Sequence, residues 1–243
     1  VHLVPLAPEH AESLFENIGH PNIFRYMPYK GPETLDEMRA LVDTSLELAQ
    51  REGDVPFAIK HLEDDTFVVS TSYIDVRKND RGLEIGGTWV GLDYQRTPVN
   101  TECKFLLLKH AFEDLGAFRV QLKTDSRNNK SQEAIARIGA KREGTLRNHM
   151  KLWDGHLRHT VMFSITHKEW QNVGRARRRE GEAPAEPMHA FYLHHVIARR
   201  SETDRAISGP HPNQKHHLPK SAQTPTKKLL AFQIFALRSK RKN

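Results

Sequence analysis

The chain has 243 residues, of which 28% are charged and 37% are hydrophobic. This is enough for one sizeable domain with an appendage. No apolar run approaches the ~20 residues that a membrane-spanning helix needs. The single cysteine, Cys103, excludes an internal disulfide, and together these features lead us to expect a cytoplasmic protein without membrane contact.

The net charge of +7 is unevenly distributed along the chain. Residues 171–243 hold 15 Lys+Arg and 5 Asp+Glu, a net charge of +10. Residues 1–170 hold the remaining 22 basic and 25 acidic residues, a net charge of −3. A mildly acidic body argues against a nucleic-acid-binding core.

The first half of the chain predicts one strand, two helices and then three strands. Apolar residues at helical spacing define the helices, and short β-branched runs between acidic or Asn/Gly turns define the strands. The predicted ranges are a strand at 2–6, helices at 7–18 and about 33–50, and strands at 55–62, 67–76 and 83–91.

The second half alternates helices and strands and ends in a hairpin. A helix over about 100–115 stops at Gly116, and a strand at 118–124 alternates apolar and polar residues. A further helix ends at Gly139, and strands at 145–153 and 157–165 flank an Asp-Gly turn. The order β-α-α-β-β-β-α-β-α-β-β predicts an α+β (mixed α/β) domain with a mixed sheet covered by helices.

Residues 171–243 lack this patterning, so we predict a folded domain over 1–170 and a basic, Pro-containing, mostly disordered tail over 171–243. The tail carries "RARRR" from Arg175 and "SKRK" from Ser239. Such clusters bind phosphate backbones without specificity, so a nucleic-acid or ribosome contact is one interpretation. We favour the other, a solvated extension.

Three motifs, taken in order and spacing, carry a family resemblance. They are "LEIGGTWVG" followed by "YQRTPVNTE", then "QLKTDSRNNKS", then "AIARIGAKREG". Together they resemble the GCN5-related N-acetyltransferase (GNAT) superfamily, nearest to the branch that includes ribosomal-protein N-terminal alanine acetyltransferases. The resemblance covers about residues 1–170. It implies a twisted sheet of about seven strands whose two middle strands, "EIGGTWV" and "FRVQLKT", splay apart.

The resemblance implies that acetyl-CoA binds as co-substrate in the gap between these two strands, without a metal. Its pyrophosphate would lie on the unpaired N–H groups at the start of the next helix. The implied cofactor-binding residues are Val90, Gly91, Gln95, Arg96, Thr97, Val99, Asn100, Thr101, Asn128 and Ser131. The chain departs from the family pattern, because Pro98 and Asn100 occupy the places of glycines and proline has no N–H. An ordinary capped turn is the alternative.

Glu84 is the candidate general base. The attacking amine has a pKa near ~8, so deprotonating it at neutral pH is a modest task for a carboxylate acting directly or through water. The alternative is a structural glutamate paired with an arginine such as Arg119 or Arg81. Backbone N–H groups near Val90 and Gly91 are candidates to polarise the thioester oxygen.

The proton donor to the leaving thiolate is less clear from the sequence. Many relatives place a tyrosine seven residues after Asn128, where this chain has Ile135. Either Ser131 or a water molecule would then supply the proton, or no donor is needed, because a thiolate with a pKa near ~8.5 leaves tolerably well. Asn128 also has a structural interpretation, as the N-cap of its helix.

Acceptor contacts are expected from the loop between the first two helices, at Arg25, Tyr26 and Tyr29. Cys103 is interpreted as a packed residue, and no metal site is read into the three histidines of the terminal hairpin, His149, His156 and His159.

The resemblance predicts acetyl-CoA-dependent N-acetylation of a primary amine, a protein N-terminus or a small amine, by direct attack in a ternary complex. Acetylation of a small molecule or antibiotic, and a non-catalytic acyl-CoA-binding module, remain alternatives. The protein would be a monomer or a homodimer.

Overall fold

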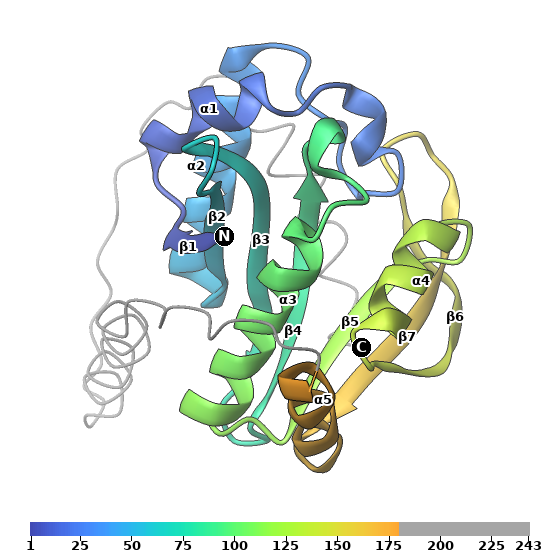
Figure 1. Cartoon of the computed structure of the whole chain (residues 1–243). Coiled ribbons are helices and arrows are strands. Elements are labelled where there is room, and N and C mark those ends of the chain that lie inside the picture. The colour runs from blue at the N-terminus through green and yellow to red at the C-terminus, as the bar shows by residue number, and fades with distance from the viewer. Residues whose placement is uncertain (180–243) are drawn as a thin grey trace, which may run out of the picture.

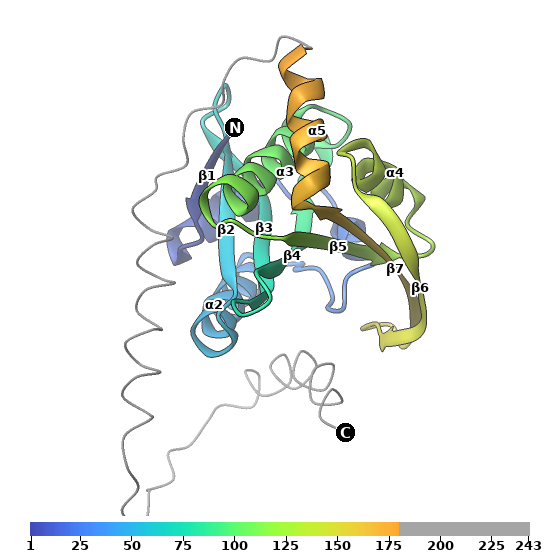
Figure 2. The same cartoon turned by 90° about the horizontal axis from the view of Figure 1, so that it is seen from below.

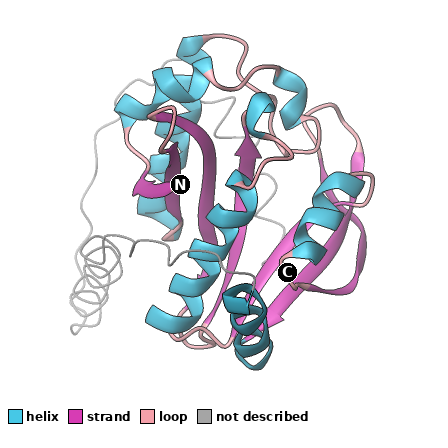
Figure 3. Ribbon diagram, in the orientation of Figure 1, coloured by secondary structure: helices cyan, strands magenta, loops and turns pink. Residues whose placement is uncertain are grey.

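The computed structural model describes residues 1–179 and contains a seven-stranded mixed sheet with helices on both faces (Figure 1). The strands are β1 (His2–Pro5), β2 (Val55–His61), β3 (Thr66–Arg77), β4 (Gly82–Val90), β5 (Arg119–Asp125), β6 (Lys141–Lys151) and β7 (Leu157–Thr166). The α-helices, cyan in Figure 3, are α1 (Ala11–Glu16), α2 (Leu35–Glu52), α3 (Val99–Lys109), α4 (Asn129–Arg137) and α5 (His167–Arg179). The predicted α+β architecture is therefore confirmed.

The longest helix, α2, shows how local sequence sets an element. The Thr34 side chain accepts a hydrogen bond from the Glu37 N–H at 3.2 Å, which satisfies one unpaired donor of the first turn. At the other end, Gly53 adopts a left-handed conformation with φ of 74°, which glycine tolerates without a steric penalty. Both signals are present in the sequence, which explains why this helix is predictable.

The strand order is β1-β2-β3-β4-β5-β7-β6, and within it only β4 and β5 are parallel. These two strands pair only from Gly82–Glu84 to residues 119–121. Beyond that point they diverge, as Figure 1 shows. The predicted splay of the middle strands is confirmed, and it leaves an open wedge between the later parts of β4 and β5.

Helices divide between the two faces of the sheet (Figure 2). One buried cluster joins α1 and α2 to the sheet and includes Leu14, Met38 and Trp89. A larger cluster joins α3, α4 and α5 to the opposite face and includes Leu107 and Trp170. The wedge between β4 and β5 thus has a different set of helices on each side.

Three elements differ from the sequence prediction. The helix expected over 100–115 is α3 followed by a π-helical turn, η4 (His110–Asp114). Strand β6 starts at Lys141, earlier than predicted, because it follows β7 past a bulge. No helix is predicted after the last strand. Helix α5 lies there and runs past the predicted domain boundary at residue 170, with Trp170 and Val173 packed on the core.

The predictions for residues 180–243, including the basic cluster from Ser239, lie outside the described residues. Within residues 1–179, no helix is both long and apolar enough to cross a bilayer.

Candidate functional site

A cavity of about 1140 Å³ opens at the wedge between β4 and β5. Its walls come from strands β3 to β7, from helices α2 and α4, from the start of α3, and from the loop before α2. Most of the site residues predicted from the sequence meet in these walls: Tyr26, Tyr29, Glu84, Val90, Gln95, Arg96, Thr97, Asn100, Asn128 and Ser131.

Four predicted residues, Arg25, Gly91, Val99 and Thr101, do not line the cavity. The Gly91 N–H donates to the Val68 carbonyl oxygen at 2.8 Å, so it is not free to polarise a thioester, and the prediction is wrong for this group. The role of Gly91 is instead to let the backbone of Asn17 pack closely against it. A Cβ at this position would lie 2.2 Å from the Asn17 carbonyl oxygen.

A β-bulge in β4 sets the directions of the side chains that follow it. Ser72 pairs with Gly86 and Ser70 with Trp89, so β4 holds one residue more than β3 over this stretch. Gly87 takes the left-handed conformation, with φ of 63°. A bulge of this kind re-aims the residues beyond it. Thr88 consequently meets α3, whereas Trp89 joins the cluster with α1 and α2.

The turn before α3 presents unpaired backbone donors. The N–H groups of Arg96, Thr97, Asn100 and Thr101 donate no hydrogen bond among the described residues. Pro98 is the N-cap and provides no side-chain cap. The N–H of Val99, the first residue of the helix, donates a long hydrogen bond to the Thr97 hydroxyl oxygen, at 3.4 Å. Asn100 lies inside the helix and does not cap it, so this is not an ordinary capped turn.

Two further features of this turn fit an anionic ligand that also carries amide groups. Arg96 has a φ of 65°, a left-handed conformation that non-glycine residues adopt mainly at functional turns. The Asn100 Oδ1 atom is buried and has no hydrogen-bond partner within residues 1–179. Free N–H groups at a helix start bind phosphate oxygens, and an unpaired carbonyl oxygen accepts an amide N–H.

Glu84 lies at the inner end of the wedge, where the pairing of β4 and β5 stops. Its carboxylate is buried and forms an ion pair with Lys123, with 2.9 Å between Oε1 and Nζ. Gln121 donates to Glu84 Oε2 at 3.1 Å. The arginine partners considered from the sequence are wrong. Arg119 pairs with Glu143, and the Arg81 guanidinium lies over the Phe118 ring.

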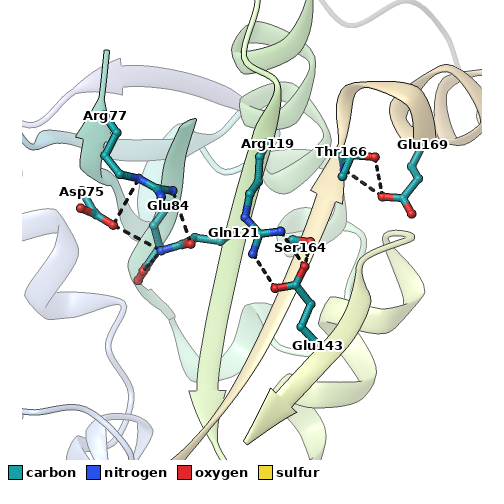
Figure 4. A network of polar contacts seen from close by, with 9 residues as sticks. All are labelled: Asp75, Arg77, Glu84, Arg119, Gln121, Glu143, Ser164, Thr166 and Glu169. Atoms are coloured by element: carbon teal, nitrogen blue, oxygen red, sulfur yellow. Dashed lines mark hydrogen bonds and ion pairs between the residues drawn. The ribbon is translucent and has the colours of Figure 1, made fainter. Parts of the chain in front are cut away.

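A polar network fixes the closed end of the wedge (Figure 4). Gln121 Nε2 lies 3.4 Å from Asp75 Oδ2, and Gln121 Oε1 accepts from Arg77 at 3.5 Å. These contacts, with the bond to Glu84, connect β3, β4 and β5. The position of the Glu84 carboxylate is therefore set by side chains from three strands.

The start of α4 supplies another wall of the cavity. Asn128 Oδ1 accepts a hydrogen bond from the Ser131 N–H at 3.1 Å, so the N-cap interpretation of Asn128 is confirmed. Asn128, Ser131 and Ile135 all line the cavity. Ile135 places an aliphatic group where the resemblance would put a phenol.

The opposite end of the cavity is formed by the loop before α2 and by β7. Tyr26 and Tyr29 line it, and burial raises the pKa of the Tyr29 phenol. Arg158 of β7 is 5% exposed, and its Nη1 donates to the Tyr26 carbonyl oxygen at 3.2 Å. Burial lowers the pKa of Arg158, while Asp125 and Glu84 act in the opposite sense.

Sequence reasoning missed Lys104, Lys123 and Arg158, which all line the cavity. Arg158 occupies an inward-facing position of β7, and Lys123 occupies one of the polar positions that alternate with apolar ones along β5. Both were overlooked because a polar residue on a strand usually faces solvent. Lys104 follows Cys103, and both are buried in α3. Burial raises the pKa of the Cys103 thiol to about 11, which agrees with a packed residue, and lowers the pKa of Lys104 to about 8.

Comparison with known proteins identifies the family. Residues 1–141 match the family model described as "Acetyltransferase (GNAT) domain". The chain belongs to the GNAT acetyltransferase family. Comparison with curated proteins gave no match. The superfamily inferred from the three motifs is thus confirmed. Membership of this family supports an acyl transfer to amines, and GNAT acetyltransferases use acetyl-CoA as co-substrate.

Solved structures of GNAT proteins resemble the chain over its described part. A crystal structure from T. thermophilus, named "putative acetyltransferase", is 35% identical, with a TM-score of 0.65, over 73% of this chain and 92% of that one. A GCN5-related N-acetyltransferase from Brucella melitensis is 26% identical, with a TM-score of 0.67, over 73% of this chain and 80% of that one.

Ribosomal-protein acetyltransferases are also among the structural neighbours of this GNAT chain. RimL, a ribosomal L7/L12 alpha-N-protein acetyltransferase, is 17% identical, with a TM-score of 0.58, over 68% of this chain and 88% of that one. At this identity the likeness concerns the fold.

Proposed function

We propose that this GNAT protein transfers the acetyl group of acetyl-CoA to a primary amine, by direct attack of the amine on the thioester in a ternary complex. The observation that carries the proposal is the short pairing of β4 with β5, which ends at Glu84 and opens into the cavity. Unpaired strand edges can pair with the amide groups of an extended ligand.

The turn before α3 would hold the pyrophosphate. The free N–H groups of Arg96, Thr97, Asn100 and Thr101 are its donors, and the Arg96 side chain adds positive charge. Pro98 removes one donor that a glycine would offer. Val90, Gln95, Asn128 and Ser131 would contact the same ligand from the end of β4 and the start of α4. Val99 remains a proposed backbone contact.

Glu84 would take the proton of the attacking amine, directly or through water. Its carboxylate is held by Gln121 and Lys123, so its position is fixed before the substrate arrives. Preorganisation of this kind lowers the cost of reaching the reactive geometry. The amine would enter between Tyr26 and Tyr29, with Arg25 at the rim.

Thiol release with an acceptor panel tests the proposal. Purified protein is incubated with acetyl-CoA and with either peptides bearing free N-termini or small amines, while free thiol is measured and products are weighed by mass spectrometry. We expect release that depends on the amine. Peptide and small-amine arms decide between the two acceptor classes.

Glu84→Gln is the decisive variant. We expect kcat to fall by about 10²–10⁴-fold, the usual contribution of a general base, with CoA affinity within about threefold of wild type. Glu47→Gln, an exposed carboxylate on α2, is the matched control. Measurable CoA binding without thiol release from any acceptor would refute the enzyme proposal in favour of an acyl-CoA-binding module.

A further inference from the structure

Lys104 is a buried cation in the wall of the cavity. It is 6% exposed, and its Nζ donates to the hydroxyls of Thr71 at 3.2 Å and Thr88 at 2.5 Å. An ammonium has three N–H groups, and the third has no acceptor among the described residues. No carboxylate pairs with Lys104 there. A buried charge without a counter-ion is costly, so its position calls for a functional explanation.

The neighbours of Lys104 leave its charge uncompensated. β3 and β4 contribute the neutral hydroxyls of Thr71 and Thr88, which also bond to each other at 2.7 Å. On α3, the titratable neighbour is Cys103, whose raised pKa keeps it a neutral thiol. Burial is the main cause of the lowered pKa of Lys104, about 8. That value is close to the ~8.5 of an ordinary thiol.

Lys104 and Glu84 lie on opposite faces of the wedge. Leu83 and Ile85 point into the cluster that contains α3. Because side chains alternate along a strand, Glu84 between them points to the other face. The bulge at Gly87 then turns Thr88 back toward α3 and Lys104. A thioester held between the strands would have a carboxylate on one side and an ammonium on the other.

An acid that assists the departing thiolate would act from the α3 side, opposite Glu84. Ile135 of α4 lines the cavity and has no proton to give. Ser131 is a hydroxyl, a far weaker acid than an ammonium. Lys123, the other lysine of the wedge, is on the Glu84 face and is held in its ion pair.

We propose that Lys104 is the proton donor to the CoA thiolate. This rests on the proposed acetyl transfer. The amine nitrogen forms a bond to the thioester carbonyl carbon, and the carbon–sulfur bond breaks. Glu84 accepts the proton of the amine, and the third N–H of Lys104 passes its proton to sulfur. The products are an amide and CoA thiol. After release, Glu84 gives its proton to solvent and the neutral Lys104 amine takes one up, so both groups return to their starting state.

Lys104→Met tests the assignment, with Lys109→Met on the same helix as the control outside the cavity. The variant should fold, since Thr71 and Thr88 still bond to each other. We expect kcat to fall by about 10²-fold, the low end for acid–base catalysis because a thiolate leaves tolerably well. The fall in wild-type activity above about pH 8 should vanish in the variant, while CoA affinity stays within about threefold.

A second readout needs no turnover. Thiolate absorbance of the CoA complex is followed against pH. In wild type, a nearby ammonium should lower the pKa of the bound thiol by about one unit or more, and in Lys104→Met the bound thiol should titrate like free CoA.

The outcomes separate the two proposals. Unchanged kcat, pH profile and thiol titration in Lys104→Met would overturn the role of Lys104 alone. If the fall in activity above about pH 8 disappears in Ser131→Ala but persists in Lys104→Met, the proton donor is Ser131. Absence of turnover by wild type with every acceptor would overturn both.

Discussion

The two lysines of the wedge differ in what surrounds their charge. Lys123 on β5 is partly buried and lies 2.9 Å from the Glu84 carboxylate, so each charge of this pair has a partner. Lys104 on α3 has only the hydroxyls of Thr71 and Thr88. Both side chains line one cavity. A compensated pair can fix geometry, whereas an uncompensated cation is a group that a ligand or a leaving group can still use.

This difference predicts opposite effects on stability when each lysine is removed. Loss of Lys123 leaves a buried carboxylate without its cation. Loss of Lys104 removes a charge whose burial was never compensated. Stability measurements on the two variants therefore test whether the comparison holds, before any assay of activity.

The largest effect is expected from Lys123→Met. Breaking a buried ion pair costs about 3–5 kcal/mol, and we take about 3 kcal/mol because the Lys123 side chain is 19% exposed. This loss of stability is measured as the change in the free energy of unfolding, from urea denaturation at pH 7. Adding Glu84→Gln removes the orphaned charge, so the double variant should regain most of the loss. A fully additive double variant would show that the pair is not coupled.

Lys104→Met should instead stabilise the fold, by about 2 kcal/mol at pH 7. A pKa lowered from 10.5 to about 8 corresponds to about 3 kcal/mol of cost to the protonated native state, less about 1 kcal/mol for the lost hydrogen bonds.

The pH dependence of that gain has a definite sign. Below pH 8 both native and unfolded Lys104 are protonated, and the native state bears the full cost. Between pH 8 and 10.5 the unfolded chain binds more protons, so wild-type stability from this group rises with pH. The advantage of Lys104→Met should shrink over that window. A constant difference between the two proteins from about pH 7 to 10 would contradict the buried, uncompensated cation.

The smallest effect is expected at the phosphate turn, on the same wall as Lys104. Pro98→Ala keeps the helical backbone angles, φ −62° and ψ −20°, and adds an N–H. One further hydrogen bond to pyrophosphate should tighten CoA binding about threefold by calorimetry. Pantetheine, which lacks the pyrophosphate, should show no gain. Equal gains for both ligands would place the effect elsewhere.

Much of this arrangement could be predicted from local sequence. The three motifs placed the splayed strands, the turn at Arg96 and the start of α4 at Asn128 correctly in the cavity wall. Gly91 was misassigned because its N–H is consumed by Val68, a residue of β3. The arginine partners considered as an alternative for Glu84 were wrong because the register of β4 against β5 brings Lys123 to the carboxylate instead.

Local sequence was enough to establish the order of elements as far as β7, and the family, since periodicity, caps and turns depend on neighbouring residues. Which charges meet depends on the packed fold. Lys104 reaches Thr71 across 33 positions, and Lys123 reaches Glu84 across 39. One extra residue in β4 turns Thr88 toward α3. Such contacts depend on strand register and bulges, because a shift of one residue reverses the face that each side chain occupies.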